Sequence, residues 1–442
     1  MKKTSTFQGG VHPHEHKELT ENLQFEIMPN PKEIILPFGQ HIGKPAAPVV
    51  EKGAEVKAGT VVADQDGFVS SPIHSSVSGK VKKIFTGATV SGFPKEGILI
   101  ESAEQNENEY MVGLDPETVA PEEIRERIRA AGIVGQGGAA FPTSVKLTPP
   151  PDKKIDYVIL NGCECEPYLT RDYRFMMERP ESVVSGLKLI MKSLGVEKGG
   201  IGIEDNKPEA VKKLNEIAKD IPGIEIVVVK TKYPQGAEKM LIKAAIDREV
   251  PPGRLPLDVG VVVQNIGTAV AIHDAITKGE PLITAAVTVS GKGIKNPKNL
   301  IIRVGTRLGD VLEYCGGVTD DAKKVIAGGP MMGVAQHDFS APIMKATSGI
   351  LVLTDKEINE HKETPCLRCG KCIDVCPLNL VPTRLARLAQ LERYEEAEEL
   401  GITVCMECGT CTFTCPANIP LVQWLRLGKQ KVIQIQRERK TA

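Results

Sequence analysis

The run Cys366-x-x-Cys369-x-x-Cys372-x-x-x-Cys376-Pro377 is the most informative stretch of this chain, and it recurs as Cys405-x-x-Cys408-x-x-Cys411-x-x-x-Cys415-Pro416. Three closely spaced thiolates wrap one corner of an iron–sulfur cube, and the fourth cysteine of such a run reaches the other cube. The spacing therefore predicts two [4Fe–4S] clusters. The expected ligands are Cys366, Cys369, Cys372 and Cys415 for one cluster, and Cys405, Cys408, Cys411 and Cys376 for the other.

Other uses of cysteine fit this pattern poorly. Structural zinc sites use pairs of the form Cys-x-x-Cys, not three cysteines and a fourth at the same spacing twice over. A disulfide framework is typical of small secreted domains, whereas this chain has 442 residues. Because two cubane clusters relay single electrons, the sequence indicates an electron-transfer protein.

Length and composition argue against two further classes, nucleic-acid-binding proteins and membrane-spanning proteins. The length suggests about three domains, and the net charge of -1 with 4% aromatic residues argues against a nucleic-acid partner. The chain has no run of about 18 apolar residues, so we expect no membrane span. Any link to a membrane is then expected to pass through partner subunits.

Residues 1–110 are expected to form an N-terminal arm and a small β domain. The segment Ser71–Val81 resembles the barrel-sandwich fold of lipoyl and biotinyl carriers, which place a modified lysine at a hairpin tip. Here the turn offers Pro72, Ile73 and His74, so we expect a carrier fold without carrier chemistry.

The arm also carries His12, His14 and His16. A metal site is one interpretation. A surface arm packed on a later domain is the preferred one, because the spacing matches no standard ligand set.

Residues 111–278 show the alternation of strands and helices that indicates an α/β domain. A helix predicted over 121–131 leads into the loop Gly135-Gln136-Gly137-Gly138-Ala139-Ala140-Phe141, followed by Lys146. A glycine-rich loop lets backbone N–H groups approach a phosphate or a flavin ring, and a lysine neutralises phosphate.

Polar residues follow three predicted strands of this domain. The strand 157–160 leads to Asn161, Glu164 and Glu166, and the strand 258–263 leads to Asn265 and Thr268 in the loop before a helix from Ala269. A third strand, 224–229, is followed by Glu238 at a helix N-terminus. Because ligands bind at the carboxyl ends of the strands in open α/β sheets, these side chains are expected to converge. Cys163 and Cys165 are interpreted as packing thiols.

The rest of the chain divides into two parts. Residues 279–350 are expected to form a small β-grasp module, and residues 351–442 the helical domain of the clusters. One helix over Pro382–Leu400 is predicted to join the cysteine runs, with Leu385, Leu388 and Leu391 on its apolar side.

These motifs in this order resemble one family, the RnfC subunits of the Rnf complex, an ion-translocating ferredoxin:NAD⁺ oxidoreductase. The resemblance covers essentially the whole chain. The middle part is also similar to the flavin subunit of respiratory complex I, which binds FMN and NADH and continues into a soluble-ligand-binding β-grasp module. The motifs that carry the resemblance are Thr6–Pro13, Gln40–Gly43, Asn161–Leu169, Tyr233–Gly236 and both cysteine runs.

The resemblance implies roles for residues at matching positions. Glu166 is expected beside the flavin–nicotinamide pair as the catalytic residue, and Glu238 on the nicotinamide side. The remaining cofactor contacts implied are Gly135, Gly137, Gly138, Ala139, Phe141, Lys146, Asn161, Glu164, Asn265 and Thr268. Three positions depart from the complex I pattern: Gln136 replaces an arginine, Cys163 an aspartate and Ala237 the first of two acids.

The expected protein is thus an α/β multidomain flavoprotein that exchanges hydride between NAD(H) and FMN and single electrons with two [4Fe–4S] clusters. The resemblance implies a peripheral subunit on the cytoplasmic face of the cell membrane. Its expected partners are integral membrane and iron–sulfur subunits, with ferredoxin an indirect one. Two alternatives stay open: a soluble flavin and iron–sulfur protein of the cobalamin-reductase or proline-reductase partner type, and a non-catalytic relay subunit with a decayed flavin site.

Overall fold

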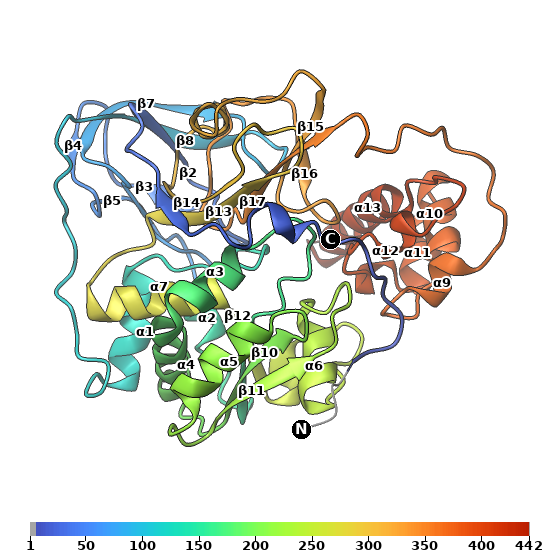
Figure 1. Ribbon diagram of the computed structural model, residues 1–442, viewed down its shortest axis with the longest axis horizontal. Helices are drawn as coiled ribbons and strands as arrows, with labels where there is room; N and C mark the ends of the chain where they lie inside the picture. The colour runs from blue at the N-terminus through green and yellow to red at the C-terminus, as the bar shows by residue number, and fades with distance from the viewer. Residues whose placement is uncertain (1–5, 442) are drawn as a thin grey trace.

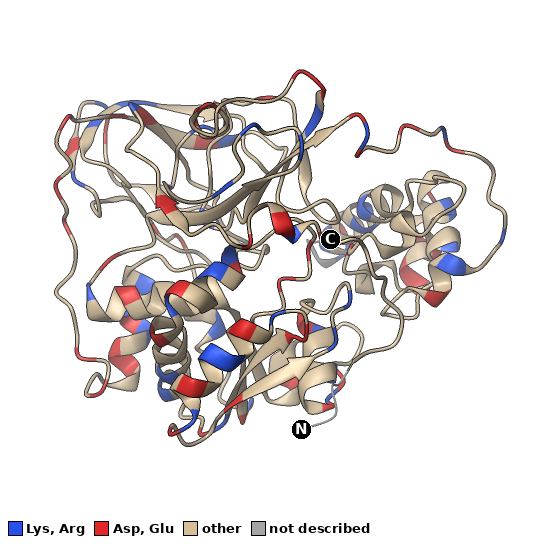
Figure 2. Cartoon of the chain, viewed as in Figure 1, with Lys and Arg blue, Asp and Glu red and all other residues tan. Residues whose placement is uncertain are grey.

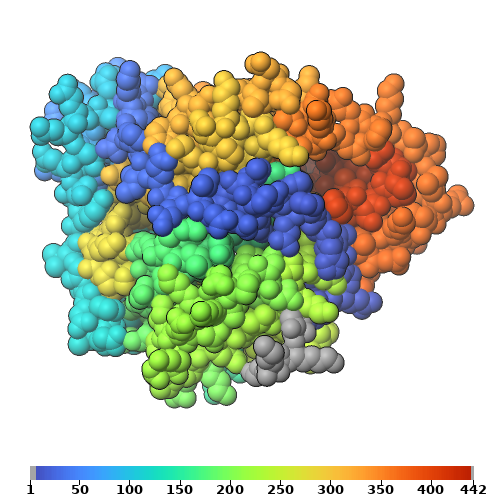
Figure 3. All heavy atoms as spheres, in the orientation of Figure 1, coloured from blue at the N-terminus to red at the C-terminus, as the bar shows by residue number. Residues whose placement is uncertain are grey.

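A computed structural model describes residues 6–441 and divides into β-rich, α/β and helical parts (Figure 1). In the orientation of Figure 1 the β-rich parts lie above the α/β part, and the helical part lies to one side of both. The N-terminal arm runs over the surface between the β-rich and α/β parts (Figure 3).

The first β-rich part is built from two small sheets. Four consecutive residues are buried in each of two of its strands, and Ile34, Leu36, Ile98 and Ile100 are fully buried in one apolar core. His74 is also buried here, in strand β6, and burial lowers its pKa to about 3, so its imidazole is neutral. The strands in sheet order are β2 (Glu33–Pro37), β8 (Lys95–Ser102), β7 (Gly79–Gly87) and β4 (Glu55–Val56), and then β3 (Ala47–Pro48), β5 (Val61–Asp64) and β6 (Ile73–His74).

The α/β part has a four-stranded parallel sheet with helices on both faces. Side chains alternate between two cores: Val158 and Leu160 face one side of the sheet, while Tyr157 and Ile159 face the other. The sheet order is β11 (Ile224–Val229), β10 (Gly199–Glu204), β9 (Tyr157–Asn161) and β12 (Val261–Asn265). The helices are α1 (Pro121–Ala130), α2 (Thr143–Lys146), α3 (Arg171–Glu178), α4 (Pro180–Leu194), α5 (Pro208–Ala218), α6 (Glu238–Ile246) and α7 (Ile266–Thr277).

Two predicted boundaries in this part were wrong. Asp258 lies in the short 3-10 helix η2 (Pro256–Val259), and the strand begins only at Val261. The next helix begins at Ile266, not Ala269, because the Asn265 side chain caps it by accepting a 2.8 Å hydrogen bond from the Gly267 N–H. Thr268 therefore lies in the first turn of α7.

The second β-rich part has a mixed six-stranded sheet that includes a strand from the N-terminal arm. Strand β1 (Phe25–Ile27) pairs in parallel with β14, at the edge of the sheet. The sheet order is β1, β14 (Lys298–Arg303), β13 (Thr284–Ser290), β17 (Gly349–Thr354), β15 (Ala322–Ala327) and β16 (Val334–Gln336), and helix α8 (Leu308–Tyr314) packs beside it.

The helical part corrects one prediction. The segment predicted as a single helix forms α10 (Pro382–Gln390) and α11 (Tyr394–Glu399), separated by a turn in which Glu392 has φ 55°. The turn lets both helices pack on the long C-terminal helix α13 (Leu421–Thr441), and it leaves Leu391 48% exposed. Leu385 and Leu388 are buried as predicted. The remaining helices are α9 (Lys371–Asp374), η3 (Ile402–Val404) and α12 (Thr410–Phe413).

The connection from β17 to α9 runs along the outer side of the molecule and carries both acidic and basic residues (Figure 2). Among residues 6–441, none of the helices is long and apolar enough to span a membrane.

Lys345 joins the two β-rich parts to the α/β part. It is 1% exposed, and its ammonium donates 2.7 Å hydrogen bonds to the backbone oxygens of Pro72 and Gly132. Burial lowers its pKa from 10.5 to about 7. An unpaired buried carbonyl costs about 1–3 kcal/mol, so this lysine is expected to hold the three parts together.

We expect Lys345→Met to lower the thermal midpoint markedly, with a loss of roughly 2–5 kcal/mol because two carbonyls lose their donor. Between pH 7 and 10.5 the unfolded lysine binds a proton that the folded one does not. The stability of the natural protein relative to the variant should therefore rise with pH over this range. Calorimetry at several pH values tests this, with exposed Lys324→Met as control. Equal midpoints for the two variants would contradict it.

Candidate functional site

The eight cysteines of the two runs surround two cavities in the helical part. One cavity is lined by Cys366, Cys369 and Cys372 of the first run and by Cys415 of the second. The other is lined by Cys405, Cys408 and Cys411 of the second run and by Cys376 of the first. The fold thus brings together the two sets of four thiols expected from the spacing, and a set of four thiols matches the ligands that a [4Fe–4S] cluster takes.

The backbone repeats itself around the two cavities. Arg368 and Glu407 both have positive φ, and their N–H groups lie 3.4 and 3.3 Å from the sulfurs of Cys366 and Cys405. Gly370 and Gly409, at φ 78° and 81°, each begin a short helix. Such N–H groups stabilise a cluster's negative charge, so both loops suit the group the cysteines imply.

The two cysteine sites differ in exposure. Cys405, Cys408 and Cys411 are buried, whereas Cys366 and Cys369 are exposed. We use the term inner site for Cys376, Cys405, Cys408 and Cys411, and outer site for Cys366, Cys369, Cys372 and Cys415.

The inner site packs on the α/β part. The Tyr233 hydroxyl donates a 2.8 Å hydrogen bond to the backbone oxygen of Cys408, and both residues are buried. An apolar cluster surrounds this contact, formed by Val11, Cys165, Met331, Val375 and Met406 together with Tyr233 and Cys408. The junction therefore combines the N-terminal arm, the α/β part, the second β-rich part and the helical part.

The α/β sheet has a topological switch point between β9 and β12. From β9 the chain continues through β10 to β11 on one side, and it returns to place β12 on the other. Asn161 and Asn265 end these two strands and are paired in register. Crevices that bind ligands in open α/β sheets lie at this position, so the two asparagines mark the candidate cofactor site.

The glycine-rich loop is fastened beside these asparagines. The Gln136 N–H donates a 2.9 Å hydrogen bond to the Thr268 hydroxyl, and its side chain donates to the Gly267 oxygen at 3.1 Å. Gly137 lies against Asn265, since an added Cβ would come within 3.4 Å of the Asn265 Cβ. Gln136 thus has a structural task at the position where the complex I pattern has arginine.

The tip of the loop is free to meet a ligand. Gly137, Gly138 and Ala139 are exposed, and Gly138 has φ 116° with open space where a Cβ would lie. Phe141 is half-buried, and its backbone oxygen accepts a 2.9 Å hydrogen bond from the Gly135 N–H, which closes the loop. Exposed backbone amides of this kind suit the phosphate and ring of a flavin nucleotide.

Gly138→Ala should weaken FMN binding at least about tenfold, a change of about 1.4 kcal/mol or more, because a methyl group and a strained φ enter the loop that faces the cofactor. Flavin fluorescence titration of the apoprotein measures the change. Gly195→Ala is a matched control. Gly195 likewise has a positive φ, of 65°, and open space where a Cβ would lie, but it ends α4 and is not part of the glycine-rich loop. Equal losses in both variants would show that strain alone is responsible.

Lys146 and Glu238 form an ion pair of 2.6 Å between α2 and the start of α6. The sequence predicted separate roles for them: Lys146 was expected to contact a phosphate, and Glu238 was expected on the nicotinamide side. Both side chains are partly exposed, so a bound nucleotide has access to them as a pair.

Glu164 lies at the N-terminus of α3 and acts on that helix. Its carboxylate accepts hydrogen bonds from the N–H groups of Asp172 at 2.6 Å and Tyr173 at 3.1 Å. Burial raises its pKa, against the opposing charge of Lys17. Since both oxygens serve the helix, the structure gives the predicted cofactor contact no support.

Glu166 connects the α/β part to the second β-rich part. Its two carboxylate oxygens accept hydrogen bonds from the N–H groups of Met331 at 3.0 Å and Met332 at 2.9 Å. Burial raises its pKa to about 7, although these N–H groups favour the ionised form. Glu166 is thus a carboxyl that titrates near neutrality at the junction leading to the inner site.

Two buried cations that the sequence analysis did not select hold this region in place. The Lys17 ammonium donates to the backbone oxygens of Glu164 at 2.9 Å, Glu166 at 3.1 Å and Leu169 at 2.5 Å. Arg171, 2% exposed, donates to the Gln136 oxygen and to oxygens of the second β-rich part. No local motif marks them, because their partners are backbone oxygens distant in sequence.

The thiols of Cys163 and Cys165 lie beneath the site. Cys163 is fully buried in the apolar core under the sheet, and Cys165 accepts a 3.3 Å contact from the Gly236 N–H. Burial raises the pKa of both thiols, so they stay protonated.

Four family models match the chain. They are the RnfC barrel sandwich hybrid domain over residues 5–105, the Nuo51 FMN-binding domain over 128–274, the SLBB domain over 286–335 and a 4Fe-4S dicluster domain over 365–420. They confirm the predicted fold class and the predicted FMN and [4Fe–4S] cofactors, and the FMN-binding model spans both asparagines and the glycine-rich loop.

Known relatives match nearly the full length. The chain is 49% identical to the subunit designated C of the proton-translocating ferredoxin:NAD(+) oxidoreductase complex of Clostridium ljungdahlii, over 89% of this chain and 86% of that protein. It is 45% identical to the subunit of the same designation in the Na(+)-translocating complex of Acetobacterium woodii, over 98% of each. A solved NAD+-reducing [NiFe]-hydrogenase is similar over 66% of this chain and 59% of its own, with 19% identity and a TM-score of 0.49. The sequence relatives establish that the chain belongs to the family of RnfC subunits of the Rnf complex, the ion-translocating ferredoxin:NAD⁺ oxidoreductases.

Proposed function

We propose that this chain is the subunit of an ion-translocating ferredoxin:NAD⁺ oxidoreductase at which NAD(H) is oxidised or reduced. The observation that carries the proposal is the direct packing of the inner cysteine site on the α/β part, through Tyr233 and Cys408. A nicotinamide moves two electrons as a hydride while a cubane accepts one, and FMN, when bound, supplies the conversion between them.

The chain's own residues position and tune this exchange. Asn161, Asn265 and the loop Gly135–Ala139 hold the cofactor at the switch point of the sheet. Glu166 supplies an ionisable carboxyl at the junction of the α/β and second β-rich parts, and the cation of Lys17 fixes the backbone that carries it.

The inner and outer sites differ in solvent exposure, and this difference indicates the order in which electrons pass through the subunit. The inner site is the one in contact with the α/β part, so it exchanges electrons with the flavin. The outer site has exposed cysteines at the end of a long surface connection, so it exchanges electrons with a partner subunit. We place the subunit on the cytoplasmic face of the membrane, against the membrane and iron–sulfur subunits of the complex, and ferredoxin acts through those partners.

The test is anaerobic addition of NADH to the purified chain loaded with FMN and both clusters. We expect bleaching of the flavin absorbance followed by bleaching of the iron–sulfur absorbance. Cluster absorbance that stays constant while no flavin is retained would overturn the enzymatic role and leave a relay subunit. Flavin bleaching without cluster bleaching would contradict the proposed route.

A further inference from the structure

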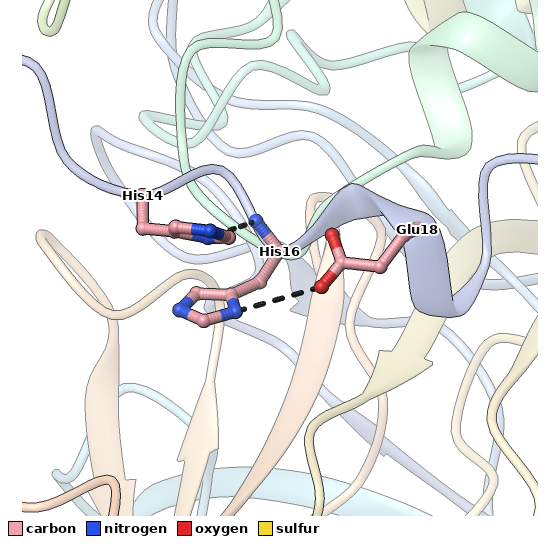
Figure 4. A group of neighbouring side chains, drawn as sticks. All are labelled: His14, His16 and Glu18. Carbon is pink, nitrogen blue, oxygen red and sulfur yellow. Dashed lines mark hydrogen bonds and ion pairs between the residues drawn. The ribbon is translucent and has the colours of Figure 1, made fainter.

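The N-terminal arm holds a group of metal-binding side chains that has no part in the proposed electron transfer. His14, His16 and Glu18 each offer one ligand atom, and these atoms lie within 4.8 Å of one another (Figure 4). The two imidazole rings have centroids 4.1 Å apart, and the Nδ1 of His16 lies 3.7 Å from the Glu18 carboxylate. We refer to these three residues as the arm site.

The residues between them point inward and anchor the segment. The Glu15 carboxylate accepts a 2.8 Å hydrogen bond from the Asn206 side chain, and its backbone oxygen accepts one of 2.7 Å from the Tyr168 N–H. Lys17 is buried and donates to the oxygens of Glu164, Glu166 and Leu169. Alternate residues are therefore fixed to the protein, which holds the three ligands of the arm site on the outer side.

The surroundings keep the His16 ring in place. It stacks on the Tyr168 ring, with centroids 4.6 Å apart and 17° between the planes. The charges of Glu18 and Glu357 favour a cation here, and Lys292 opposes it.

We propose that His14, His16 and Glu18 bind a divalent transition-metal ion of the Zn²⁺ class. Two imidazoles and one carboxylate are a donor set that such ions take, with the remaining position open to water. Hard cations such as Mg²⁺ prefer oxygen ligands and should bind poorly. The Nδ1 of His14 accepts a 3.3 Å hydrogen bond from the His16 N–H, so the metal either displaces this bond or takes the other ring nitrogen.

Metal binding would fix the conformation in which the arm packs on the segment 164–169. That segment carries Glu166, and the arm continues through β1 into the second β-rich part. The arm site is thus suited to a structural ion that stabilises the junction of these parts, independent of the redox cofactors.

The test uses the chain fully loaded with iron and FMN, dialysed against micromolar Zn²⁺ and analysed for zinc and iron. We expect about one zinc per chain, unchanged iron content, and a dissociation constant raised at least about tenfold by His16→Gln, since even outer-shell changes cost about 10–100-fold. His14→Gln and Glu18→Gln should weaken binding in the same direction. His12→Gln is the matched control, because His12 is exposed on the same arm but outside the arm site.

Zinc uptake that is equal in the natural chain and in all three variants would overturn the proposal, as would the absence of stoichiometric uptake. Uptake accompanied by loss of iron would show that zinc enters the cysteine sites instead. Thermal midpoints with and without Zn²⁺ provide a second measure, and we expect a zinc-dependent rise that His16→Gln abolishes and His12→Gln retains.

Discussion

NADH should still reduce the flavin of a Cys408→Ala variant, but electrons should no longer leave it. Cys408 lines the inner site, and its backbone oxygen accepts the hydrogen bond from Tyr233 of the α/β part. Removal of one of four thiols is expected to prevent assembly of the inner cluster. Transfer from NADH to an external one-electron acceptor that takes electrons from the clusters should fall by at least about a hundredfold, equivalent to about 2.7 kcal/mol or more in the barrier.

Cys369→Ala is the matched control, because Cys369 is exposed and lines the outer site. In this variant NADH should reduce both the flavin and the inner cluster, and only the final transfer should be lost. Stopped-flow absorbance follows the flavin, and electron paramagnetic resonance identifies the reduced cluster. Reduction of the outer cluster in Cys408→Ala would refute the order flavin, inner site, outer site.

The second large effect is expected for Glu166→Gln. We propose that Glu166 faces the nicotinamide, which becomes a cation as hydride leaves NADH, and a carboxylate in that position favours the change. Burial raises the pKa of Glu166 to about 7, so the natural rate of flavin reduction should rise with pH around neutrality. We expect Glu166→Gln to remove this dependence and to slow flavin reduction roughly 10- to 100-fold above pH 7, or about 1.4–2.7 kcal/mol.

Glu164→Gln separates this role from a structural one. Glu164 caps α3, so its variant should lose stability while its pH–rate profile keeps the same shape.

The folded pKa of Glu166 lies above its ordinary value of 4.5, so this carboxyl's contribution to stability should be lost as the pH rises from 4.5 through 7. If Glu166→Gln lowers the thermal midpoint but leaves the rate of flavin reduction and its pH dependence unchanged, Glu166 has only a structural role, as the acceptor of the Met331 and Met332 N–H groups.

Local sequence determined a large part of this protein. The cysteine spacing identified the two sets of four thiols, because three thiols of each set come from one short loop and the fourth cysteine of such a run is known to reach the other cube. The alternation of strands and helices in the α/β part followed from the sequence pattern, and the strand over 224–229 has the predicted bounds. The motifs also sufficed to identify the family, which the relatives confirm.

Tertiary structure decided which polar residues are free to act. Glu164 and Glu166 are two residues apart, yet one caps a helix and the other bonds to a loop of another part. The break at Glu392 depends on packing against α13, and Lys17, Arg171 and Lys345 find their partners among distant backbone oxygens. A buried cation is stable only where folding places hydrogen-bond acceptors around it. Because these acceptors come from distant parts of the chain, the local sequence pattern cannot predict them.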